Sequence, residues 1–182
     1  IVPELQVLRL RGPVRGEGGW RMKQIVTTEE LQDFIGYEFK HPEILEEALT
    51  RRASANENPL EKEKFMDPLA TLGDAVLATI VVLQLYEKGN RTKGKLTQEK
   101  IDQITRKKTH AFAKKHHLQQ YVHWGKGESK QTECMESVKA LDTVTEALIG
   151  AIFLDAQKSG INGLKIVQEF LERKNFFDKY SA

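Results

Sequence analysis

One carboxylate stands out because it lies inside a long apolar segment. Asp74 is the only charged residue between Pro68 and Tyr86, in a run that is apolar on nearly every side. An ionised carboxylate taken out of water is strongly unfavourable, so Asp74 must be exposed at a local opening, protonated, paired with a base or bound to a metal ion. No lysine or arginine in the same run can pair with it. The sequence leaves the four alternatives open.

Two further acids, Asp142 and Glu146, continue the apolar stripe of another predicted helix. They recur with Ile149 and Phe153 at i, i+4, i+7 and i+11, so the four side chains share one face. If Asp74 joins them, three negative charges meet, which is tolerated only with a cation between them. Oxygen ligands favour Mg²⁺ or Mn²⁺ over zinc. The alternative is plain solvent exposure of both acids at the rim of the helix.

Positive charge is concentrated in residues 91–126. The whole chain carries a net charge of +2, but this segment holds ten lysines and arginines against Glu99 and Asp102. Such a segment is typical of proteins that bind a polyanion, although a solvated helix face is the alternative. The candidate contacts to nucleic-acid phosphates are Lys93, Lys95, Arg106, Lys107, Lys108, Lys114, Lys115 and Lys126.

The elements that must position these residues are predicted to be helices. A capping box at Thr27 and Glu30, with Gly36 behind it, opens the series, and alternation of the β type is absent beyond a few residues. We take the apolar run as the central buried helix and residues 53–64 as a loop. The predicted helices cover residues 27–35, 42–52, 68–86, 96–118 with one break, 138–154 and 161–176.

Length and composition predict one soluble domain. The chain has 182 residues, of which 40% are hydrophobic and 30% charged. Residues 1–21 are expected to be a poorly ordered N-terminal extension and residues 22–182 the domain. The single cysteine, Cys134, has no disulfide partner and no zinc-site spacing, which favours a cytoplasmic setting. We expect no membrane contact, since residues 68–86 barely reach a spanning length and contain Asp74.

Short motifs carry a resemblance to a known family. The segment L-G-D-A-V-L at residues 72–77 resembles the core of the ribonuclease III signature, and E-A-L-I-G-A at residues 146–151 with Leu154-Asp155 resembles its second acidic motif. Further matches keep the family's order, from about residue 26 to 178: residues 36–39, 48–50, 55–57 and 125–128. The resemblance implies an all-α, ribonuclease III-like endonuclease domain, which pairs as a homodimer. No double-stranded-RNA-binding domain is expected after it.

The resemblance also implies an activity. The family cuts double-stranded RNA during RNA processing with divalent metal held by carboxylates from two helices, and Asp74 and Glu146 match such catalytic and metal-ligand positions. Mg²⁺ or Mn²⁺ is the implied cofactor. Asp142 and Asp67 are further candidate ligands, although Asp142 lies one residue before the family's aspartate position, which rotates its side chain by about 100°. For Asp67 the competing interpretation is the N-cap of the apolar helix.

Several positions depart from the family pattern. Residues that are acidic in the family are Ala70, Thr143 and Lys93 here, and Thr71 replaces the phenylalanine of the dimer contact. The leading hypothesis is a metal-dependent endoribonuclease acting on double-stranded RNA. The alternative is a catalytically weakened domain that binds RNA or ribonucleoprotein without efficient cleavage. A helical interaction protein without any RNA role is the third hypothesis.

Overall fold

Helices make up most of the described residues. The computed structural model describes residues 14–16, 19–21, 27–58 and 63–177. Its helices are α1 (Thr28–Ile35), α2 (Pro42–Leu49), α3 (Arg52–Asn56), α4 (Asp67–Glu87), α5 (Lys93–Gln103), α6 (Arg106–Lys115), α7 (Thr132–Met135), α8 (Val138–Lys158) and α9 (Gly163–Arg173), with single 3-10 turns η1 (Leu118–Gln120) and η2 (Glu128–Lys130). The predicted all-α class is confirmed.

The N-terminal segment contains two very short strands. Strand β1 (Val14–Gly16) pairs antiparallel with β2 (Gly19–Arg21), with Val14 opposite Arg21. The sequence analysis did not anticipate this ribbon. Most of the expected N-terminal extension lies outside the described residues, and its separation from the domain at residue 22 stays a prediction.

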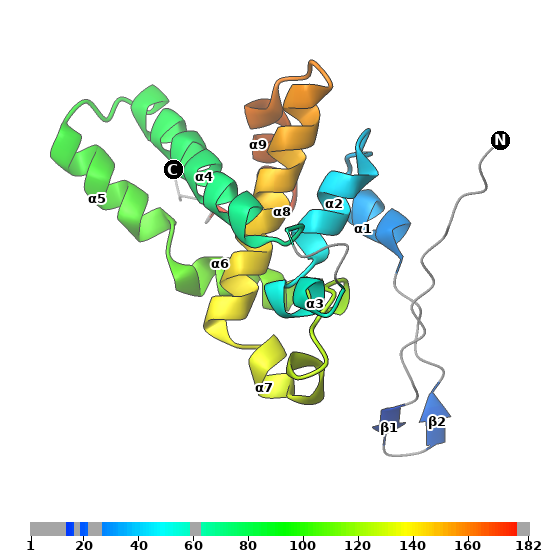
Figure 1. The fold of residues 1–182 in the computed structure, drawn as a ribbon. Coiled ribbons are helices and arrows are strands. Elements are labelled where there is room, and N and C mark those ends of the chain that lie inside the picture. The colour runs from blue at the N-terminus through cyan, green and yellow to red at the C-terminus, as the bar shows by residue number, and fades with distance from the viewer. Residues whose placement is uncertain (1–13, 17–18, 22–26, 59–62, 178–182) are drawn as a thin grey trace.

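Helix α8 is the centre of the fold. Helices α4, α6, α2 and α9 all pack against it, and Figure 1 shows α8 running through the middle of the molecule with α4 crossing beside it. Nearly every side of α8 between Ala140 and Ala156 is buried. The expectation that the apolar run of residues 68–86 is the central helix is therefore wrong. Because α8 contains small residues and acids as well as large apolar residues, its sequence did not indicate that it lies at the centre of the fold.

Helix α4 buries one side and exposes the other. The buried side packs onto α8, whereas the exposed side carries Thr71, Asp74, Ala75, Thr79, Leu83 and Tyr86. By length and composition alone α4 could cross a membrane, but a core helix of a soluble protein satisfies the same criterion. Its packing on α8 accounts for the apolar character of its buried side.

Local sequence signals placed several helix ends correctly, although most of the predicted C-terminal ends differ by three or four residues. Thr27 and Glu30 form the predicted capping box, and Gly36 closes α1 with φ of 70°. The predicted break in the basic stretch falls between α5 and α6, where Thr105 accepts a hydrogen bond from the Lys108 amide as N-cap. The predicted loop of residues 53–64 instead begins within the short helix α3.

Two glycines let α4 and α8 come into backbone contact. A methyl group at Gly73 would collide with the backbone carbonyl of Glu146, and one at Gly150 would collide with the carbonyl of Leu69. Backbone atoms cannot rotate away as a flexible side chain can. The two helices can therefore approach this closely only while both positions lack a side chain.

We expect Gly73→Ala and Gly150→Ala to lower the free energy of unfolding by about 1–3 kcal/mol or more, because each forces α4 and α8 apart. Urea unfolding followed by circular dichroism measures the loss. The matched control is Gly94→Ala within α5, where an added methyl group meets nothing within 4 Å and helix propensity improves. Equal stability of all three variants would contradict the close-packing argument.

Candidate active site

Asp74 is exposed at the surface of α4. Of the four alternatives for this carboxylate, the structure realises exposure, because α4 has a solvent-facing side that its composition did not reveal. Asp74 directly follows Gly73, which is the residue of α4 that closely approaches the backbone carbonyl of Glu146 on α8. The carboxylates of Asp74 and Glu146 therefore arise from adjacent points of two touching helices.

Glu146 is half-buried and lies in a negative environment. Its pKa is raised from 4.5 to about 7, first by burial and then by the charges of Asp142 and Asp74, while Arg106 acts in the opposite direction. Within the described residues, no group donates a hydrogen bond to its carboxyl. Glu146 thus lacks the compensation that a buried carboxylate needs, and the charges of Asp74 and Asp142 are near enough to act on it.

Asp142 is already engaged by partners from α6. Arg106 donates from Nε to Oδ2 at 2.8 Å, and the Thr109 hydroxyl donates to Oδ1. The Asp142 side chain is only 8% exposed. Helix α8 is continuous through this position, so no local distortion turns Asp142 toward the direction of Thr143. The structure therefore places a base and a hydroxyl, rather than open space, at this candidate ligand.

Asp67 lies apart from the other acids. It is the first residue of α4, and the N-cap is Met66, so the interpretation of Asp67 as N-cap is wrong. Arg52 bonds the Asp67 carboxylate through Nε at 3.0 Å and through Nη2 at 2.9 Å. Seven residues of α-helix separate Asp67 from Asp74, a rise of about 10 Å. The structure does not bring these two carboxylates together.

The positions that depart from the family pattern supply no acid. Ala70 is buried in the core, while Thr143 and Thr71 each bond a backbone carbonyl one turn earlier in their own helix. Lys93 is exposed at the start of α5. Among the residues that the structure describes, no group of three or more acidic, histidine or cysteine side chains could hold a metal ion. Among the four candidate ligands, Asp142 and Asp67 are bonded to other side chains, which leaves Asp74 and Glu146 as the two carboxylates that could bind a metal ion.

The candidate phosphate contacts are mostly exposed. Lys108 is half-buried, and the other seven face solvent: Lys93, Lys95, Arg106, Lys107, Lys114, Lys115 and Lys126. Four of these have acidic partners, because Arg106 pairs with Asp142, Lys95 with Glu99, Lys114 with Glu136 and Lys126 with Glu57. Since α6 packs directly on α8, its basic residues lie beside the helix that carries Glu146.

A second carboxylate, Asp155, is buried, but hydrogen-bond donors compensate for its removal from water. It accepts hydrogen bonds from the Tyr37 hydroxyl at 2.6 Å, from the amides of Lys40 and His41, and from His41 Nδ1 at 2.9 Å. Burial alone would raise the pKa of Asp155, but these donors hold it below its usual value. Asp155 therefore ties α8 to the segment before α2, and it is a structural residue.

Sequence reasoning missed Thr109 and the pairing of Arg106 with Asp142. Thr109 lies three residues after Arg106, so both can face the same neighbour on α6. That spacing was the available signal. The neighbour itself lies 36 residues further on from Arg106 and becomes visible only in the fold.

The pKa of Glu146 predicts a pH dependence of stability. Because the folded-state pKa of about 7 exceeds the ordinary 4.5, the stabilisation associated with the protonated form is complete below pH 4.5 and is lost as the pH rises toward 7. Glu146→Gln mimics the protonated form, so its gain in unfolding free energy over the parent should be larger at pH 8 than at pH 5. Urea titrations at both pH values measure this, with Glu133→Gln on exposed α7 as the control. An identical difference at both pH values would contradict the assignment.

Comparison with known proteins identifies the family. A family model described as Ribonuclease-III-like matches residues 41–174. Ribonuclease 3 of Listeria monocytogenes is 36% identical over 149 residues, which is 81% of this chain and 62% of the relative, and ribonuclease 3 of Limosilactobacillus reuteri is 33% identical over 153 residues, 81% of this chain and 63% of the relative.

Solved structures agree with the sequence relatives. Two structures of the nuclease domain of ribonuclease III from Campylobacter jejuni align with TM-scores of 0.69 at 26% and 27% identity, and they cover 81% and 88% of this chain and 98% and 100% of theirs. The present chain spans less than two thirds of the length of the curated relatives that it matches. The family model and these relatives show that the chain belongs to the ribonuclease III family, over the region of the nuclease domain.

Proposed function

We propose that this domain is a metal-dependent endoribonuclease that acts on double-stranded RNA. Family membership supports an endoribonuclease. The observation that supports the finer proposal is the backbone contact between α4 and α8, in which Gly73, the residue before Asp74, approaches the backbone of Glu146. The negative charges of Asp74 and Glu146 are close enough to act on one another, and two such carboxylates are the donors that a hard divalent cation prefers.

The donor set fits one Mg²⁺ or Mn²⁺ ion rather than a larger cluster. Mg²⁺ is usually bound through one or two carboxylates and keeps several waters, which matches Asp74 and Glu146. Asp142 is bonded to Arg106 and Thr109, and Asp67 to Arg52, so neither adds a free carboxylate. We expect weak metal binding that strengthens as Glu146 loses its proton.

The residues of the chain then have separate tasks. When bound, the cation would supply charge neutralisation and activation of the attacking water. Asp74 and Glu146 would hold it at the seam between α4 and α8. The exposed lysines of α5 and α6 would hold the phosphates of the duplex, an interaction that recognises charge and shape rather than base sequence. Binding should therefore weaken steeply with added salt.

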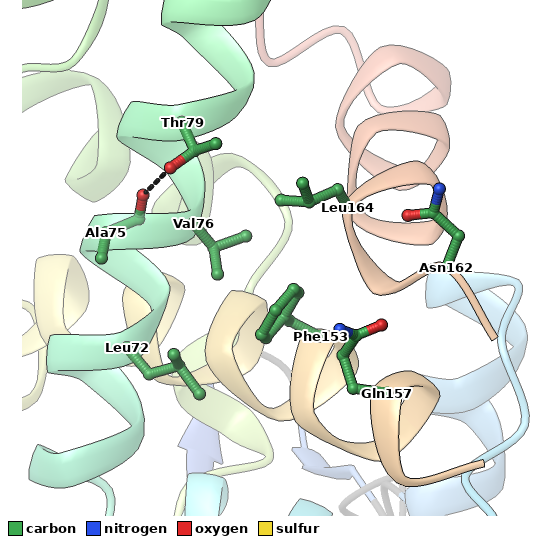
Figure 2. Close-up of a pocket in the computed structure, with 8 residues that line it drawn as sticks. All are labelled: Leu72, Ala75, Val76, Thr79, Phe153, Gln157, Asn162 and Leu164. Atoms are coloured by element: carbon green, nitrogen blue, oxygen red, sulfur yellow. Dashed lines mark hydrogen bonds between the residues drawn. The ribbon is translucent and has the colours of Figure 1, made fainter. Parts of the chain in front are cut away.

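We also propose a homodimer that pairs through the exposed side of α4. An apolar hollow of about 270 Å³ lies there, lined by Leu72, Ala75, Val76 and Thr79 of α4, by Phe153 and Gln157 of α8, and by Asn162 and Leu164 at the start of α9. In Figure 2 the side chains of Val76, Phe153 and Leu164 point toward one another. Such an exposed apolar face favours association. The Campylobacter jejuni nuclease domain is described with a region involved in dimer formation.

The setting that we propose for this activity is the cytoplasm, without membrane contact. Cys134 is an exposed free thiol, which a reducing compartment preserves.

A second candidate function is RNA binding without efficient cleavage. The ion pair between Asp142 and Arg106 favours it, because that pair neutralises one acid of the site with a protein side chain instead of a metal ion. Under this alternative the basic residues of α5 and α6 still bind duplex RNA, but the rate of cleavage is negligible.

Cleavage of a labelled RNA duplex with Mg²⁺ or Mn²⁺ distinguishes the two functions. We expect the parent to cleave, and Asp74→Asn and Glu146→Gln to lose on the order of 100-fold in rate, because each removes one of the two available carboxylates. Asp33→Asn on exposed α1 and Glu133→Gln on α7 are the matched controls. Full activity of Asp74→Asn would refute the proposed site, whereas duplex binding without cleavage by the parent would favour the second candidate.

The dimer is tested by placing a charge in the hollow. Thr79→Arg should shift the protein from dimer to monomer in sedimentation experiments, because an unpaired guanidinium would be buried at the proposed interface. Thr132→Arg, on exposed α7, is the control and should leave the mass unchanged. A monomeric parent protein would rule the proposed dimer out.

A further inference from the structure

The guanidinium of Arg106 is hydrogen-bonded at one edge, while most of the side chain is exposed. Its Nε is bonded to the buried Asp142 carboxylate, while the side chain as a whole is 69% exposed. Within the described residues, Nε is the one atom of this guanidinium with a bonded partner, so Nη1 and Nη2 face solvent. The side chain is thus held at one edge and offers donors at the other.

The anchor is built from both sides. Thr109 occupies the Oδ1 atom of Asp142, and Arg106 occupies Oδ2. Because Arg106 and Thr109 lie three residues apart on α6, both hydrogen bonds to the Asp142 carboxylate come from the same face of that helix. Two partners fix the plane of the Asp142 carboxylate, and with it the direction of the guanidinium.

Stability alone is a poor explanation for this arrangement. Arg106 is the first residue of α6, where the helix dipole disfavours a cation, and the first turn also contains Lys107 and Lys108 but no acidic residue. Asp142 is buried, and the cost of removing its carboxylate from water offsets much of the attraction to a guanidinium that is itself largely exposed. The pair therefore adds little net stability.

The free donors lie beside the candidate active site. Asp142 is one helical turn before Glu146 on α8, so the two side chains are neighbours on the same face. The charge of Arg106 is one of those that act on Glu146. A guanidinium can donate from Nε to a carboxylate and from its Nη atoms to a phosphate at the same time, which a lysine ammonium cannot reproduce.

We propose that Arg106 binds the RNA phosphate nearest to Asp74 and Glu146 through its Nη donors, and that Asp142 and Thr109 are positioning residues that aim it. This inference rests on the proposed action on duplex RNA. It assigns Asp142 a role different from that of a metal ligand, and it separates Arg106 from the lysines of α5 and α6, which supply charge without a fixed direction.

The decisive variant is Asp142→Asn. It removes a negative charge near the RNA, so general electrostatics predicts tighter binding, whereas loss of the anchor predicts weaker binding. We expect duplex affinity, measured without metal in EDTA at fixed salt, to fall about five- to tenfold. Arg106→Lys keeps the charge and should lose a similar factor. The charge-preserving control Lys130→Arg, on η2, should bind like the parent.

A milder variant covers the case in which Asp142→Asn fails to fold, as judged by urea unfolding. Thr109→Val removes one hydroxyl at nearly constant volume and should weaken binding by a smaller factor in the same direction. The double variant Arg106→Lys/Asp142→Asn should bind no worse than the weaker single variant, because both changes break one unit. If the parent cleaves RNA, kcat should fall with affinity in Arg106→Lys.

Tighter or unchanged RNA binding by folded Asp142→Asn or Thr109→Val, together with unchanged binding by Arg106→Lys, would overturn the proposal. Arg106 would then serve only to neutralise Asp142. A parent protein that binds duplex RNA but does not cleave it would refute the proposed enzyme while these binding measurements still decide the role of Arg106. A parent that does not bind duplex RNA would refute both.

Discussion

The backbone contact between α4 and α8 is the constraint on which the rest of the structure depends. Gly73 and Gly150 each leave room for a carbonyl of the opposite helix, so the two longest helices meet without side chains between them. This contact makes α8 the centre of the molecule (Figure 1). It also brings Asp74, which directly follows Gly73, next to Glu146, whose carbonyl Gly73 touches. The residues that pack α4 against α8 are therefore next to the residues of the candidate active site.

Three acids of α8 show how surroundings decide the role of a carboxylate. Asp155 is surrounded by donors and is a structural tie. Asp142 has one base and one hydroxyl and is neutralised from α6. Glu146 has neither and is left with a raised pKa beside other negative charges. Because a carboxylate without donors is the one that gains most from an added cation, Glu146 is the acid of α8 on which our proposal of a metal site rests.

Local patterns were sufficient for most of the helices. The capping box at Thr27, the break before Arg106 and the apolar stripes depend on neighbours within a turn or two, and the structure contains them close to where they were predicted. The family motifs also gave the right fold class, since they run through both long helices. The same reasoning overrated the apolar run of α4 as the central helix, because hydrophobicity reports how apolar a helix is and not how many neighbours it has.

The sequence by itself determined that Asp74, Asp142 and Glu146 lie on helices, and that the latter two share a face. Only the tertiary structure decided that Asp74 is exposed, that Asp67 forms an ion pair with Arg52 and that Asp142 forms an ion pair with Arg106. A spacing of four residues fixes which side chains are neighbours within one helix, because the backbone repeats every 3.6 residues. It does not fix which helix lies opposite, because that depends on the packing of segments far apart along the chain.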